Sequence, residues 1–453
     1  MQTDVGVSTK GVPSMQIDGQ ESVETSLDQK HVRELTCLYF EKVHEMCPVL
    51  CPSTYMASLF LPSPLCPPLC LQLIVMALAA SISKEQMSCA ISLYHRSRGY
   101  AEDDDIANLT DSPSLPHVQC WLLLANFEAQ QAVFSRASMS FTRSVRGAQM
   151  LQMHRIDVDE IDVLATTPAY ILEKEEWRRT WWAIFNTDRF LSATTGWPLL
   201  INEHDVLTRL PASERAICNG QFTHLHSLQS LLRQDIEPYS TLTSRVLIAQ
   251  IFHTAMQQSS AFSLESPLEL NNGEYWEKHR AIEQQLTKFQ ASLPHELRLF
   301  QSYGSTEAAF INAMVQASSI SLHQCAIWRM HRLGLPIHMM EKSRKRLLVA
   351  AEQVVRILKA TPDLDVAMRN PILAFSASMA ALALLEDFAA NSESDGDEGV
   401  VFILNIMATI GKENAVTRSL AQQLYARMKE MGVYSVSDEQ VNAFAFSIER
   451  ITR

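Results

Sequence analysis

The sequence is poor in glycine and in charge, and above all in positive charge. It contains 14 glycines among 453 residues and 19% charged residues against 47% hydrophobic ones, with a formal net charge of -12. This composition excludes fibrous and disordered classes and is typical of a folded globular protein. Scarce glycine favours helix. The acidic balance opposes a broad duplex-binding surface, because neutralising phosphates requires clustered Lys and Arg, and it leaves room only for a local basic patch.

Motifs that mark common enzymes and metal centres are also missing. The sequence has no CxxC pair, no HExxH, no GxSxG and no glycine-rich phosphate loop. Its histidines are dispersed, and none forms an evident ligand pair with a carboxylate. The nine cysteines are odd in number and lie mainly in apolar segments, which predicts reduced thiols in an intracellular protein. We therefore predict no catalytic residue, no cofactor and no metal site.

Neither a leader nor a membrane span is predicted. Residues 1–30 are polar and mildly acidic, without an apolar core, and we interpret them as a disordered tail. The longest apolar run, 69–82, contains Gln72 and Ser81 and is shorter than the ~20 residues that a membrane helix needs. We expect a buried helix there and no membrane partner.

Apolar residues recur at helical spacing through the rest of the chain, and no strand-like alternation of useful length interrupts them. Prolines break up 47–68, where a short helix at 53–61 is expected. The segments 101–116 and 391–399 are acidic and are predicted to be loops. Helices are predicted at 31–47, 68–83, 85–100, 116–134, 138–153, 168–194, 242–263, 274–293, 307–333, 341–360, 372–390, 401–410 and 415–431. The fold class is thus all-α, one large multi-helix domain of antiparallel packed helices over 31–433, with a terminal helix or tail at 434–453.

The most strongly patterned helix, 168–194, combines tryptophans with charges. Trp177 and Trp181 lie four residues apart and share a face, and each buried indole would remove about 150–250 Å² from water. Glu175 precedes Arg179 by four residues, the favourable order for a helical ion pair. An arginine here could stack on an indole while it bonds a carboxylate from another helix. We interpret the segment as a structural brace.

These residues resemble the signature of the fungal-specific transcription factor domain, the middle homology region of zinc-cluster regulators. Three earlier blocks, 93–98, 118–124 and 137–157, are similar to the family as well and occur in the expected order. Four ordered blocks are far more specific than one. The signature consists of Glu175, Arg178, Arg179, Trp181, Trp182, Asp188, Arg189, Ser192, Gly196, Pro198 and Asp205, with Leu210 and Pro211 at its end.

The resemblance implies a nuclear regulator that controls RNA polymerase II transcription of a metabolic or secondary-metabolite gene set. It also implies a domain that restrains or transmits activity, in some members by sensing a small-molecule effector, and that commonly works as a homodimer or heterodimer. We expect the signature helix to brace other helices around an apolar cavity. Effector binding would shift the domain from an inactive to an active arrangement, provided that the effector prefers one of them.

One departure from the family concerns zinc. Typical members begin with a six-cysteine zinc cluster built on two CxxC pairs, and those zinc ligands are absent here. Cys47 and Cys51, like Cys66 and Cys70, are four apart, but they lie among prolines without basic neighbours. Either the cluster has been lost, or the assigned gene start misses it, or another protein supplies DNA binding. Promoter DNA is therefore expected to be reached either directly or through a zinc-cluster partner. A co-regulator that does not itself bind DNA is the alternative.

Two other patterns leave alternatives open. The triplet Asp103 to Asp105 invites comparison with the magnesium-binding aspartates of terpene cyclases, which would make the chain an all-α enzyme, although an apparent loop is the wrong place for it. The densest basic cluster is a candidate for nuclear import, or else the solvated start of an amphipathic helix. It consists of Lys342, Arg344, Lys345 and Arg346.

Overall fold

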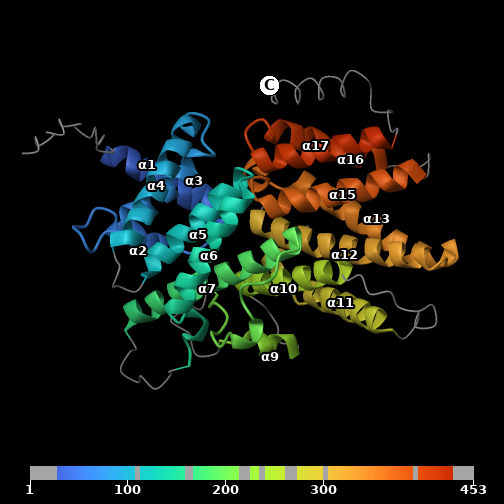
Figure 1. Cartoon of the computed structure of the whole chain (residues 1–453), viewed down its shortest axis with the longest axis horizontal. Coiled ribbons are helices and arrows are strands. Elements are labelled where there is room, and N and C mark those ends of the chain that lie inside the picture. The colour runs from blue at the N-terminus through green and yellow to red at the C-terminus, as the bar shows by residue number, and fades with distance from the viewer. Residues whose placement is uncertain are drawn as a thin grey trace, which may run out of the picture.

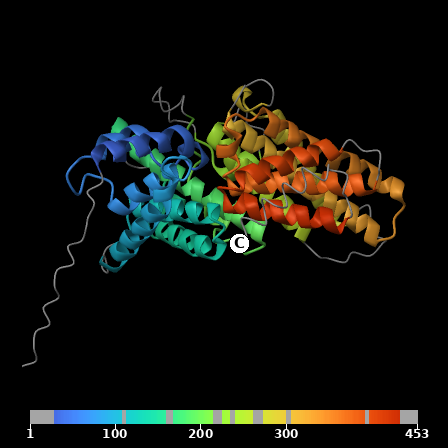
Figure 2. The same cartoon turned by 90° about the horizontal axis from the view of Figure 1, so that it is seen from above.

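A computed structural model describes residues 28–107, 113–158, 167–213, 225–233, 240–260, 273–298, 305–390 and 396–431. Every regular element within these ranges is helical, which confirms the predicted all-α class. Figures 1 and 2 show two groups of helices, the first half of the chain on one side and the second half on the other. Most of the predicted N-terminal tail and all of 434–453 lie outside the described residues.

The first group, the N-terminal lobe, contains α1 to α6. Helix α1 runs on through a π-helical turn and a 3-10 turn to residue 46, and Pro48 follows, as the proline pattern predicts. Helix α3 is buried on nearly all sides between α1, α4 and α5, which explains its unbroken apolar run. The elements are α1 (Gln29–Leu38), η1 (Tyr39–Val43), η2 (His44–Met46), α2 (Pro52–Ser58), α3 (Leu69–Ala80), α4 (Met87–Ala107), α5 (Leu115–Gln130), α6 (Phe134–Met150) and η3 (Met153–Arg155).

Helix α7 (Pro168–Thr195) joins the two groups. Thr167 caps its first turn by accepting a hydrogen bond from the backbone of Tyr170, and Gly196 ends it in the left-handed conformation, at φ +75°. It packs against α5 and α6 on one side and along α10 on the other. The segment after it carries η4 (Glu203–Asp205), α9 (Leu228–Arg233) and α10 (Thr241–Ser260).

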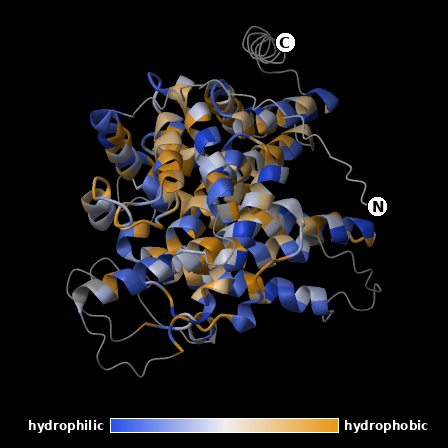
Figure 3. Cartoon of the chain, turned by 60° about the vertical axis from the view of Figure 1, so that its left-hand side comes forward, coloured by the Kyte–Doolittle hydropathy of each residue, from blue (hydrophilic) through white to orange (hydrophobic). Residues whose placement is uncertain are grey.

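The second group, the C-terminal lobe, is a stack of long helices. Neighbours along the chain pack side by side, with α12 against α13 and α15 against α16, so that apolar faces meet inside the stack (Figure 3). The elements are α11 (Glu274–Ala291), η6 (His295–Leu297), α12 (Thr306–Arg332), α13 (Ile337–Ala360), α14 (Leu364–Ala367), α15 (Pro371–Ala390), α16 (Gly396–Ile410) and α17 (Ala415–Glu430).

One described helix has the length and apolar composition of a membrane span. It is Pro371–Ala389 within α15, with a mean hydropathy of 1.6 over its most apolar window. In the structure this helix is surrounded by α12, α13, α16 and α17. Its apolar residues are therefore accounted for by the core of the helical stack.

Both predicted acidic loops were partly wrong. Helix α4 continues to Ala107, so the aspartate triplet is helical. The extension is stabilised because Ala101 is fully buried and Arg98 holds Glu102, one turn later, at 3.0 Å. In the second loop α16 already begins at Gly396. Gly399 lets that helix approach closely, since a Cβ there would lie 3.0 Å from a methyl group of Leu384.

Candidate functional site

The tryptophans of the signature helix α7 are core residues. Trp181 and Trp182 are each 1% exposed. The Trp182 indole meets the ring of Phe185 edge-on at 5.1 Å and donates a hydrogen bond of 2.6 Å to the carbonyl of Arg209. Burying an indole with its N–H bonded avoids the penalty of an unpaired donor. Trp182 thus fixes the chain beyond Pro198 against α7.

A first polar network, in the first half of α7, is almost completely buried. Arg178 donates to Asp157 at 2.6 Å and to Glu175 at 2.8 Å, and Glu175 also accepts from Arg179 at 3.2 Å. The backbone N–H of Arg209 also donates a hydrogen bond to the Asp157 carboxylate, and the backbone N–H of Ala212 donates one to the Glu175 carboxylate. Burial acts to raise the pKa of Asp157, but the hydrogen bond and charge of Arg178 outweigh it and lower that pKa. For Glu175 burial wins, and its pKa is raised.

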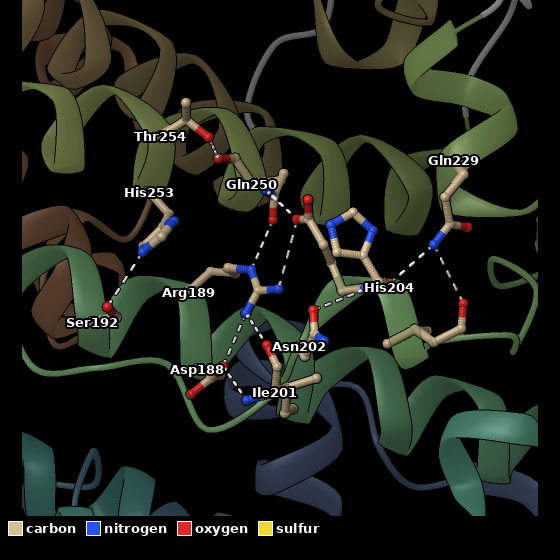
Figure 4. Close-up of polar contacts among 12 residues, drawn as sticks. Asp188, Arg189, Ser192, Ile201, Asn202, His204, Gln229, Gln250, His253 and Thr254 are labelled. Atoms are coloured by element: carbon tan, nitrogen blue, oxygen red, sulfur yellow. Dashed lines mark hydrogen bonds and ion pairs between the residues drawn. The ribbon is translucent and has the colours of Figure 1, made fainter.

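A second network lies two turns further along α7 (Figure 4). Arg189 is fully buried and donates to Asp188, to the carbonyl of Ile201 and to Gln250 of α10, at 2.9, 3.1 and 2.7 Å. Gln250 in turn donates to Glu203 at 2.6 Å. Asp188 accepts the backbone N–H groups of residues 200 and 201. The network therefore joins α7, the segment after it and α10.

The expected arginine stack occurs, but on a different ring. The Arg189 guanidinium lies 4.1 Å from the centroid of Phe185, a phenyl and not an indole. The prediction that the partner carboxylate comes from another helix was also wrong for Arg178, because its partner Asp157 lies just after η3, outside any helix. The spacing of four between Phe185 and Arg189 on α7 was the available signal for the stack. The periodicity of α7 carries no information on the contact with Asp157.

The remaining signature residues shape the turn after α7. Gly196 sits in a conformation that L side chains rarely adopt, with open space around it, so glycine is required there for its backbone alone. Ser192 donates a hydrogen bond of 2.6 Å to the carbonyl of Trp197. Pro198 and Asp205 are exposed, the latter at the end of η4.

A cavity of about 520 Å³ lies between the lobes, and α7 forms one of its walls. Its lining is mostly apolar. From α7 it includes Arg179, Trp182, Ala183, Asn186, Thr187, Phe190 and Leu191; from the N-terminal lobe Tyr39, Val43, Met46, Leu78, Leu123, Asn126 and Phe134; and from the other helices Leu242, Arg245, Val246, Phe310, Ile372, Phe375, Val416 and Leu420.

A few polar groups break the apolar lining. The side-chain oxygen of Asn186 is buried and has no hydrogen-bond partner among the described residues. Arg245, by contrast, is held by Glu307 of α12 at 2.8 Å and by the carbonyl of Met46 at 2.5 Å. That clasp connects η2 with α10 and α12. Among the described residues, the cavity thus offers two buried polar atoms without a hydrogen-bond partner, the side-chain oxygen of Asn186 and the hydroxyl of Tyr39.

The basic cluster falls in the first turns of α13. Lys342 and Lys345 are exposed, whereas Arg344 donates to Asp387 at 2.7 Å and Arg346 forms an ion pair with Glu283. The helix indeed becomes apolar from Leu347 onward. Part of the predicted import signal is therefore engaged in helix packing.

Sequence reasoning missed two groups of metal-type ligands. Cys70, Asp104 and His117 converge from α3, α4 and α5, and His279 and Glu283 of α11 meet His323 of α12. The prediction that no histidine pairs with a carboxylate was therefore wrong. The spacing of four between positions 279 and 283 on one helix was the available signal for the second group; the first has no local signal.

Comparison with known proteins identifies the family. The model of the fungal specific transcription factor domain matches residues 37–293. The chain belongs to this family. The match extends beyond the signature, which ends at residue 211, into α11. The fungal transcription factor domain therefore includes the cavity walls supplied by α7 and α10.

Relatives of this fungal transcription factor domain protein are regulators of biosynthesis. The pigment biosynthesis transcriptional activator pigB of Monascus ruber is 24% identical over 89% of this chain and 73% of its own length. The citrinin biosynthesis transcriptional activator ctnR of Monascus purpureus is 25% identical over 80% of the chain and 62% of its own length. The transcription factor tazR of Aspergillus terreus is 32% identical over 43% of the chain and 30% of its own length. The chain thus spans roughly two thirds of the first two. None of the three names describes an enzyme of the terpene-cyclase type.

Proposed function

We propose that this chain is the regulatory part of a fungal transcription regulator that controls a secondary-metabolite gene set through RNA polymerase II. The observation that carries the proposal is the double use of the signature helix. One side of α7 holds two buried ionic networks, and another side lines a cavity between the lobes. The names of the relatives, activators of pigment and citrinin biosynthesis, support the class of target genes.

The cavity is the place where an effector would act. Its volume of about 520 Å³ falls within the roughly 300–1,000 Å³ typical of small-molecule sites. The lining favours a largely apolar molecule that donates a hydrogen bond to Asn186 and forms a second one with the hydroxyl of Tyr39. Since both lobes contribute walls, a bound molecule that contacts both would favour one relative arrangement of the lobes. That differential contact is the physical requirement for a ligand to switch activity.

The same proposal covers how the protein reaches promoter DNA and where in the cell it acts. A regulator of this family acts in the nucleus. Lys342, Lys345 and Arg346 are the exposed part of the candidate import cluster, and of these Arg346 is paired with Glu283. Promoter DNA is reached either directly or through a zinc-cluster partner in a homodimer or heterodimer. The co-regulator alternative differs in one observable: the chain would co-purify with a family member and fail to shift promoter DNA alone.

Filling the cavity tests the effector role. Ala183 lines the cavity on α7, and Ala183→Phe places a ring inside it without removing any hydrogen bond. The matched control is Ala281→Phe, on the exposed side of α11. In a strain with the native gene replaced, we expect Ala183→Phe to fix expression of the gene set in one state, and the control to behave as the wild type.

Two outcomes would contradict this proposal separately. If deletion of the gene leaves the transcriptome unchanged, the regulatory role is wrong. If deletion alters a gene set but Ala183→Phe, present at normal protein level, regulates it as the wild type does, the cavity is not the switch.

A further inference from the structure

The aspartate triplet on the last turns of α4 has a role that regulation by the cavity leaves unexplained. Asp104 lies 3.1 Å from the Nε2 atom of His117 on α5. Cys70 of α3 is the third member, and one ligand atom from each residue lies within 4.8 Å of the others. Three consecutive helices thus bring a thiol, a carboxylate and an imidazole to one point.

This donor set suits zinc. Thiolate and imidazole are ligands of a borderline-soft cation, and a hard Mg²⁺ ion would instead require oxygens. In tetrahedral zinc sites the nitrogen and carboxylate bonds are about 2.0–2.2 Å, which places neighbouring donor atoms roughly 3.3 Å apart. The Asp104 and His117 atoms are already 3.1 Å apart. Very little movement would therefore be needed to accept the ion.

The surroundings orient the ligands. The Nδ1 atom of His117 lies 2.7 Å from the hydroxyl of Ser114, which orients the ring so that its Nε2 atom lies toward Asp104. An ion bound at Nε2 would replace the proton there, and Nδ1–H would then donate to Ser114. Cys120 follows His117 by three residues on α5 and is fully buried. Its sulfur lies 3.9 Å from the hydroxyl of Ser97 and is not among the donor atoms that converge within 4.8 Å.

The group is open on one side. Cys70 has no exposed surface, whereas the side chains of His117 and Asp104 are 19% and 39% exposed. The thiol forms the floor and the other two ligands form the rim, which gives an ion a route from solvent. Arg143 lies nearby, but it is engaged by Glu102 and Asp105 and stacks on Trp121 at 4.4 Å.

We propose that Cys70, Asp104 and His117 form a zinc site that ties α3, α4 and α5 together, with a water molecule at the fourth position on its open side. The site lies in the N-terminal lobe of the regulatory part and does not depend on any CxxC pair. It would stabilise the lobe that supplies one wall of the cavity. Because the thiol must ionise, binding would release a proton.

Cobalt substitution tests the site in the full chain. After treatment with a chelator under reducing conditions, we expect one Co²⁺ per chain to produce both the near-ultraviolet thiolate charge-transfer band and the visible absorption of tetrahedral Co²⁺. Zn²⁺ should displace the Co²⁺ and raise the Tm. Cys70→Ser and Asp104→Asn should weaken binding by more than about 100-fold, since loss of an outer partner alone costs roughly 10–100-fold, the range expected for Ser114→Ala.

Matched variants separate this site from the other ligand group. Asp103→Asn, in the same triplet, and Cys66→Ser, outside the cluster, should bind as the wild type does. His279→Ala should also leave the thiolate band intact, because that group contains no sulfur and its Glu283 is already paired with Arg346. The proposal is overturned if the folded wild type shows no thiolate band, or if the band survives both Cys70→Ser and Asp104→Asn. Asp104 lies at the rim, so its variant should fold even if the cysteine variant does not.

Discussion

Replacing Trp182 by alanine should destabilise the protein strongly. The side chain is 1% exposed, and an indole of this kind buries about 150–250 Å². At about 25 cal/mol per Å², that burial corresponds to ~4–6 kcal/mol as an upper limit. Measured Trp to Ala losses in cores are ~3–5 kcal/mol, and we expect a value in that range. The missing indole would enlarge the neighbouring cavity, which Trp182 lines.

Trp182→Phe separates packing from hydrogen bonding. It keeps most of the apolar contact but leaves the carbonyl of Arg209 without its 2.6 Å donor, so we expect a loss of about 1–3 kcal/mol. Trp328→Ala is the control, because that ring is 45% exposed and its contact with Arg332 is worth only about 0.5–1 kcal/mol.

Urea unfolding followed by circular dichroism measures all three variants. A Trp182→Ala midpoint equal to that of Trp328→Ala would refute the reasoning, because it would mean that the signature aromatic contributes nothing to the core. A Trp182→Phe loss as large as that of alanine would place the whole effect in the hydrogen bond.

Three further predictions concern the polar parts of the brace. Arg189→Met should lower the free energy of unfolding by about 3–5 kcal/mol, because it leaves the Asp188 carboxylate buried without its cation, and a thermal shift below that of a surface variant would contradict this. Burial, helped by the charge of Arg189, lowers the pKa of His253 to about 4. As the pH drops from about 6.5 to 4 the unfolded chain takes up the proton first, so the free energy of unfolding should fall over this range. His253→Gln should flatten that part of the pH profile, and an unchanged slope would count against the prediction. Gly196→Ala should destabilise by about 1–2 kcal/mol through its positive φ alone, with Gly196→Asn closer to the wild type, and equal stability of both variants would show that the turn relaxes.

The regular part of the fold could be predicted because it is local. Helix α7, its buried tryptophans and the pair between Glu175 and Arg179 all follow from spacing within one helix. The same local view failed at the aspartate triplet, which was predicted to be a loop because the segment 101–116 is acidic. The ion pair of Arg98 with Glu102, one turn later, helps to keep that segment helical.

The site could be predicted only in outline. A cavity was expected, but its far walls come from α10, α12, α15 and α17, and helical periodicity does not specify which helices meet. Asp157 as the partner of Arg178, and the meeting of Cys70 with His117, are likewise contacts between segments far apart in the chain. Such pairings depend on tertiary packing, which a single sequence does not encode in any local pattern.

The clasp of Arg245 on the carbonyl of Met46 and on Glu307 limits how this protein can be divided. The recognisable motifs end at residue 211, which makes that point an obvious place to cut. A fragment that stops there would leave the cavity face of α7 and the N-terminal lobe uncovered, and Met46 would lose the guanidinium that reaches it from 199 residues further on. During synthesis α10 and α12 emerge after the first lobe, so the cavity face of α7 stays uncovered until they arrive. Apolar surface exposed in this way is prone to aggregation.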